Sequence, residues 1–180
     1  YVLIQGGNII LESGGDVYLD VEASTSGDKV VVNNTPTSDN ALHLRGDIDT
    51  VRIINSAGTI AIESTTSSST SSGYTEVDNL YVANRQGGKV SVEVAVASLD
   101  LIHQDAGRIE NSAPVTTASV YGGNFKQEST GAITTLNSYG SSTANLEGSG
   151  TVTTVNIYGG TVRFRNNASD GLTVTNCNLY

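Results

Sequence analysis

Asp78 and Asp100 are the two residues of this sequence whose type and placement could support a reaction. Glycoside hydrolysis uses two carboxyl groups roughly 5 to 10 Å apart. If successive repeats of the chain stack, these aspartates could approach each other on one outward face, with Tyr81 as a platform for a sugar ring and Arg52 nearby. The competing interpretation, which we favour, is a solvated face with an ordinary ion pair, because few carboxylates gather there.

A second group consists of Tyr121, Tyr139 and Tyr158, which recur at 18 and 19 residues and each precede a glycine. In stacked repeats they would form an aromatic ladder along one edge. Stacked rings add about 1 kcal/mol per pair, so a structural role needs no ligand. As an exposed stripe, the same tyrosines could instead contact a protein or a glycan.

The remaining reactive side chains form no recognisable site. His43 and His103 lie in separate repeats, and no serine or cysteine is placed to complete a triad with either. No His, Asp and Glu cluster has metal-ligand spacing, so we expect neither a metal nor a cofactor. Cys177 is the only cysteine and is expected to fill a small apolar space near the last repeat. Adjacent threonine pairs are expected on an exposed strand rather than in an ice-binding array: Thr116-Thr117, Thr134-Thr135 and Thr153-Thr154.

These side chains must be positioned by a repeat. A six-residue apolar pattern, with a branched residue first and further apolar residues at the fourth and usually the sixth position, begins at 77, 96, 115, 133 and 152. The intervals are 19, 19, 18 and 19 residues. Self-similarity at this period is typical of a solenoid, in which stacking buries the apolar side of each coil.

Each repeat contains the pattern of two strands. The first alternates apolar and polar residues, as in 80–82 and 99–101, and the second follows a glycine corner, as in 87–92 and 159–164. No apolar stripe with helical spacing is present. We therefore expect an all-β fold, a single-stranded right-handed parallel β-helix of about eight or nine coils over residues 1–180, with loop insertions near 33–40 and 63–73.

Charge narrows the choice of partners. The chain has 18 acidic and 9 basic residues, and its formal net charge is −9. Nucleic acids and anionic membranes require a basic face, so neither is expected as a partner. No run of about 18 apolar residues occurs, so membrane insertion is not expected.

The repeats resemble the right-handed β-helix superfamily of pectate lyases, adhesins and phage tailspikes. Corners of variable length at a fixed period carry this resemblance. In character, the chain is most similar to a bacteriophage virion surface protein. The resemblance implies a non-catalytic structural or adhesive module, such as a capsid decoration protein, head fibre or tail spike, on a virion surface or otherwise extracellular. The alternatives are a polysaccharide-binding or polysaccharide-cleaving spike, a hydrolase or lyase if it is an enzyme, and a bacterial surface adhesin fragment.

The ends of the sequence add an expectation about partners. The chain opens on Val2-Leu3-Ile4 and closes on Leu172, Val174 and Leu179, with no polar cap. Solenoid ends expose strand edges and apolar core unless something covers them. We expect a segment of a longer chain or assembly, whose ends are covered by capsid or tail subunits or by another copy, with a surface glycan as a further candidate partner.

Overall fold

Two parallel β-sheets make up the described part of the chain. The structure is a computed structural model that describes residues 17–21, 29–32, 41–46, 48–54, 57–63, 76–84, 88–104, 108–111, 113–128, 131–165 and 171–180. The strands in these ranges are β1 (Val17–Val21), β2 (Lys29–Val32), β3 (Ala41–Gly46), β4 (Ile48–Ile53), β5 (Thr59–Glu63), β6 (Glu76–Asn84), β7 (Val90–Val92), β8 (Ala95–Gln104), β9 (Arg108–Asn111), β10 (Val115–Val120), β11 (Asn124–Gln127), β12 (Ile133–Ser138), β13 (Thr143–Leu146), β14 (Thr151–Ile157), β15 (Thr161–Phe164) and β16 (Thr173–Leu179).

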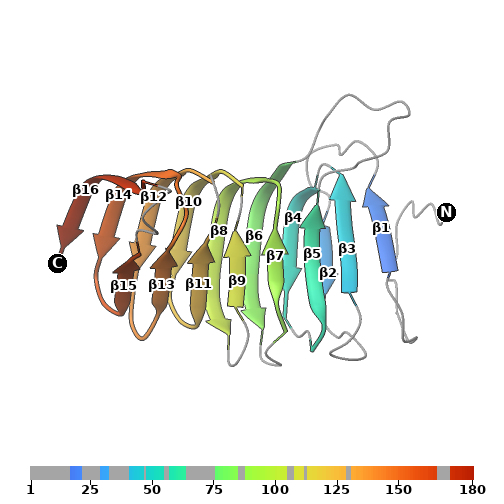
Figure 1. Ribbon diagram of the computed structural model, residues 1–180. Coiled ribbons are helices and arrows are strands. Elements are labelled where there is room, and N and C mark those ends of the chain that lie inside the picture. The colour runs from blue at the N-terminus through green and yellow to red at the C-terminus, as the bar shows by residue number, and fades with distance from the viewer. Residues whose placement is uncertain are drawn as a thin grey trace.

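The chain alternates between the two sheets. The odd-numbered strands form one sheet in the order β1 to β15, and the even-numbered strands form the other in the order β2 to β16. We call these the odd sheet and the even sheet. Every described pairing is parallel, so each coil adds one strand to each sheet, as Figure 1 shows. The expected all-β parallel solenoid is confirmed, and no helix occurs in the described ranges.

Fewer coils have the regular period of about 19 residues than the sequence predicted. Residues that begin the repeat lie beside one another in the even sheet from Val77 to Val174, at intervals of 19, 19, 18, 19 and 22 residues. About five turns therefore have the expected period, and the prediction of eight or nine coils was too high. The reason is that β1 to β5 join the same sheets through connections of other lengths. From Ile48 to its neighbour Val77, for example, the chain advances 29 residues.

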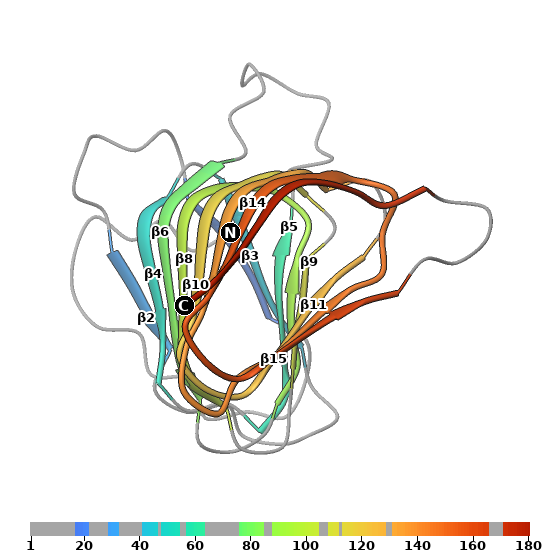
Figure 2. The same ribbon diagram turned by 90° about the vertical axis from the view of Figure 1, so that its left-hand side faces the viewer.

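A continuous apolar interior runs between the sheets. Leu80, Leu99, Leu136 and Val155 occupy one column of the even sheet and are fully buried. The odd sheet faces them with Leu, Ile, Val and Phe125, which is also fully buried. Viewed along the axis in Figure 2, the two sheets enclose one interior. Because a coil alone cannot bury this face, stacking is what stabilises the fold.

Two residues in succession lie outside the core in the even strands β10, β12 and β14. In β12, Thr134 and Thr135 both lie outside, between buried Ile133 and Leu136. Strict alternation would have turned one of them inward. The break lets the strand curve around the core, which gives the rounded corner in Figure 2. It also accounts for the adjacent threonine pairs of the sequence.

Glycine is required at the corners that lead to the odd strands. Gly123 and Gly160 have φ angles of 85° and 79°, in the left-handed region that L side chains rarely adopt. A Cβ atom added to Gly160 would lie 2.6 Å from the carbonyl oxygen of Ser142. The corners predicted at Gly122-Gly123 and Gly159-Gly160 are thus confirmed, and in both the second glycine has the positive φ.

Candidate functional site

The predicted outward column of the even sheet is present. Arg52, Tyr81, Asp100 and Ser119 are successive neighbours in β4, β6, β8 and β10. The guanidinium carbon of Arg52 lies 5.6 Å from the centroid of the Tyr81 ring, within the range of a cation–π contact. Asp100 lies on the other side of Tyr81. The register therefore places one aromatic ring between a cation and a carboxylate.

The second predicted aspartate belongs to a different column. Asp78 lies between paired residues Val77 and Asn79, so its neighbours in adjacent coils are Asp49 and Ala97. The carboxylate of Asp49 accepts hydrogen bonds from the Thr50 hydroxyl at 3.1 Å and from the Asn79 amide at 3.4 Å. Asp49 and Asp78, one strand spacing apart at about 4.8 Å, are thus the carboxylates that the register brings beside each other.

The three predicted tyrosines form a ladder. The ring centroids of Tyr121 and Tyr139 lie 4.7 Å apart, and those of Tyr139 and Tyr158 lie 4.9 Å apart, with interplanar angles of 7° and 5°. Tyr180 adds a fourth ring 4.6 Å beyond Tyr158. The sequence analysis missed Tyr180, although it follows the inward residue Leu179 just as Tyr158 follows Ile157. We call Tyr121, Tyr139, Tyr158 and Tyr180 the tyrosine ladder.

Backbone hydrogen bonds hold the rungs of the tyrosine ladder. The amide of Tyr139 donates to the carbonyl of Val120 at 2.8 Å, and Tyr158 and Tyr180 donate in the same way to the preceding coil at 2.9 and 3.0 Å. Burial, together with the neighbouring rings and Asp100, raises the pKa of Tyr139. Its phenol is therefore protonated throughout the neutral range.

An asparagine ladder runs beside the tyrosines. Asn156 donates a side-chain hydrogen bond to Asn137 at 2.9 Å, and Asn178 donates one to Asn156, also at 2.9 Å. These residues continue the column that begins at Arg52. Each amide satisfies its neighbour, so the ladder ties successive coils together outside the core.

Ion pairs on the odd sheet link neighbouring coils. Glu63 accepts from Arg45 at 3.0 and 3.2 Å, and its other oxygen lies 2.6 Å from His43 Nδ1. Burial alone would raise the pKa of Glu63. The hydrogen bonds from His43 and Arg45 outweigh that effect and lower it.

A second charged group links later coils. Lys126 pairs with Glu128 and, at 3.3 Å, with Glu147, which also accepts from Arg165 at 3.3 Å. The hydrogen bond to Glu128 is the main cause of a raised pKa at Lys126. The sequence analysis did not single out these groups because, apart from Lys126 and Glu128, their members lie far apart in the chain and meet only through strand register.

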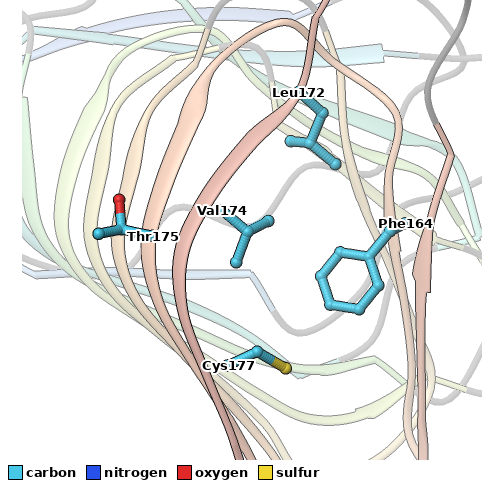
Figure 3. A pocket seen from close by; sticks show the side chains of 5 residues that line it. All are labelled: Phe164, Leu172, Val174, Thr175 and Cys177. Atoms are coloured by element: carbon cyan, nitrogen blue, oxygen red, sulfur yellow. The ribbon is translucent and has the colours of Figure 1, made fainter.

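The C-terminal end of the solenoid contains an open recess of about 410 Å³. Figure 3 shows Phe164, Leu172, Val174 and Cys177 pointing into it, with Thr175 on the outer side of β16. Cys177 continues the inward column of Val155, as expected for a small apolar residue. It is nevertheless exposed, because the even sheet ends at β16 in the described part of the chain.

Several predicted features fall in other parts of the chain. The side chain of His103 and the segments 33–40 and 64–73 lie outside the described residues, whereas Glu63 is the last residue of β5.

Among the residues that are described, no three His, Cys, Asp or Glu side chains gather as a metal site would require. None of the described segments forms a helix with the length and apolar character needed to cross a bilayer. Comparison with protein-family models, curated proteins and solved structures finds no match for this chain.

Proposed function

We propose that this chain is a non-catalytic structural and adhesive module on the surface of a phage virion, serving as a capsid decoration, head fibre or tail spike element. The observation that carries the proposal is the continuous parallel solenoid, a rod whose coils are joined through one apolar core and by ion pairs and ladders on its lateral faces. At the C-terminal end of the described residues, the edges of β15 and β16 and several apolar side chains are exposed.

The chemistry of this end face indicates that protein covers it. Phe164 is 46% exposed and Leu179 is 81% exposed, whereas their counterparts one coil earlier, Leu146 and Ile157, are buried and partly buried. Parallel strand edges left open pair readily with another strand. We propose that protein covers this face, as further residues of the same polypeptide, a capsid or tail subunit, or another copy of the chain.

The lateral faces support a structural role. The carboxylates of Glu63 and Glu147 are held by cations from neighbouring coils, and Asp49 accepts hydrogen bonds from Thr50 and Asn79. Groups engaged in this way brace the rod rather than leave a nucleophile or base free. A braced rod can hold a contact surface at a distance from its base.

We also infer that the solenoid winds to the right. Parallel strands joined by a crossover are right-handed in almost all known cases. The variable length of the connections between the two sheets at a nearly constant period fits the same choice. We therefore propose that the chain is a member of the right-handed β-helix superfamily.

Localisation and end contact can be tested together in the organism that encodes the chain. We expect antibody against the protein to label the surface of purified phage particles. A Val174→Glu variant places a charge in the end recess and should be lost from particles. Thr153→Glu places the same charge on the exposed lateral face and should be retained.

Two results would count against the proposal. One is protein that stays with cells and is absent from particles. The other is equal retention of the Val174→Glu and Thr153→Glu variants, provided both give the circular dichroism spectrum of the parent.

A polysaccharide-binding or polysaccharide-cleaving spike is the second candidate, favoured by Tyr81 lying between Arg52 and Asp100. It predicts binding to a capsular glycan or release of reducing ends, with loss of cleavage in Asp100→Asn. A panel of capsular polysaccharides that yields neither binding nor reducing ends would remove it. A bacterial surface adhesin, the third candidate, predicts the antibody label on cells instead of particles.

A further inference from the structure

We propose that the tyrosine ladder is a site of one-electron oxidation, at which dityrosine bonds join successive coils of the solenoid. Four rings lie in one stack with centroid separations of 4.7, 4.9 and 4.6 Å and interplanar angles of at most 13°. This inference is independent of where the protein acts, since it rests on the ladder alone.

The composition of the chain directs oxidation to these rings. The sequence has no methionine and no tryptophan, and its only cysteine is Cys177. Of its eight tyrosines, four belong to the ladder. Tyrosine is therefore the principal side chain from which an oxidant can remove an electron, and the ladder is where tyrosines are concentrated.

Exposure makes the rings accessible to a small oxidant. Tyr121 and Tyr158 are each 46% exposed, and Tyr180 is 72% exposed. Each ring lies just past the end of an even strand, and its backbone amide donates a hydrogen bond to the preceding coil. Exposed side chains reorient in picoseconds to nanoseconds, so neighbouring rings can tilt toward each other during a radical's lifetime.

The reaction balances without a bound cofactor. A one-electron oxidant removes one electron from each of two neighbouring phenols, and each phenol releases its hydroxyl proton to water. The two tyrosyl radicals then form a carbon–carbon bond between ring carbons ortho to their oxygens. Each of those carbons passes its hydrogen to the oxygen of its own ring, which restores both phenols. In total, the pair loses two electrons and two protons.

Stacking favours the bond within one chain over a bond between chains. A radical formed on one ring has its nearest phenol already in van der Waals range in the adjacent coil. Each bond would close a loop of the chain between Tyr121 and Tyr139, Tyr139 and Tyr158, or Tyr158 and Tyr180. Closing such loops lowers the entropy of the unfolded chain, so the cross-linked rod should melt at a higher temperature.

The test uses the full chain at high dilution with photogenerated tris(bipyridine)ruthenium(III) as the one-electron oxidant. We expect dityrosine fluorescence in the monomer, an intact mass reduced by two hydrogens per bond, and linked peptides that join neighbouring ladder tyrosines. The melting temperature of the product should rise. A parallel run with Cys177→Ala removes the exposed thiol as a competitor and should give at least the same yield.

Matched variants separate the ladder from tyrosine content. Tyr139→Phe removes two of the three stacked pairs and should lower the dityrosine yield at least twofold. Tyr81→Phe removes a tyrosine that lies outside the ladder and should leave the yield unchanged. If Tyr139→Phe fails to fold, Tyr121→Phe takes its place and should abolish only the link to Tyr139. Links through Tyr81, links only between chains, or an unchanged yield in both ladder variants would overturn the proposal.

Discussion

At the scale of single residues, neighbouring coils approach closely at a few positions. Each of these positions has a small side chain or a glycine. Ser138 is a fully buried polar residue in an otherwise apolar column. Its hydroxyl lies 2.9 Å from the Ser142 hydroxyl and donates to the carbonyl of Gly159, also at 2.9 Å. The buried polar group is thus satisfied, and it fixes the corner to the next coil.

Gly160 and Gly171 provide a matched pair for testing the corner. Gly160 has φ 79° and would bring a Cβ to 2.6 Å from Ser142, whereas Gly171 has φ 58° and nothing within 4 Å of such an atom. Gly171→Ala should cost about 1 kcal/mol of unfolding free energy through backbone strain alone. Gly160→Ala adds a clash with backbone and should cost more than about 3 kcal/mol. Chemical denaturation measures both, and equal losses would contradict the described corner.

The lowered pKa of Glu63 predicts that the free energy of unfolding depends on pH in the acid range. Because its pKa is lower in the folded state than the ordinary value of 4.5, the stabilisation is present above that pH and is lost as the pH falls through the folded pKa. Glu63→Gln should destabilise the protein by about 1 kcal/mol at neutral pH and by progressively less in acid. Glu93→Gln, at an exposed position, is the control and should have little effect at any pH. A penalty for Glu63→Gln that does not shrink in acid would exclude this role.

At the scale of the strand, each element contributes inward residues to columns of the core and outward residues to columns on the surface. The inward members are mostly apolar and differ in size, as the neighbours Leu99, Ala118 and Leu136 show. The outward members interact with their equivalents one coil away: tyrosine on tyrosine, and asparagine on asparagine. In-register parallel pairing is the condition for both kinds of ladder.

Leu136 tests the inward column. Leu136→Ala removes buried side-chain atoms from the middle of the core and should cost about 2 to 5 kcal/mol of unfolding free energy. Thr134→Ala, at an exposed position on the same strand, should change it by less than about 0.5 kcal/mol. Denaturant titration of the two variants gives the comparison. Similar losses at both positions would be incompatible with the inward orientation of Leu136.

At the scale of the whole molecule, the sequence analysis predicted the features that depend on period. Val, Ile and Leu at intervals near 19 residues predicted the shared interior, and Tyr121, Tyr139 and Tyr158 predicted the ladder. It overestimated the coil count, because connections near β1 to β5 have their own lengths. The pairing of Glu63 with His43 and Arg45 depends on which strands are neighbours across those connections, so spacing alone could not show it.

The central claim is that successive coils stack in parallel and in register, and spin labels on the outer face test it directly. Residues 134, 153 and 175 are exposed and lie side by side in β12, β14 and β16. In the Cys177→Ala background, nitroxides at 134 and 153 should lie one strand spacing apart, about 4.8 Å between backbones. Nitroxides at 134 and 175 should lie about twice as far apart. The electron paramagnetic resonance spectrum should therefore show strong spin exchange for the first pair and only dipolar broadening for the second. Equal spectra for the two pairs, or stronger coupling for the second, would contradict the solenoid.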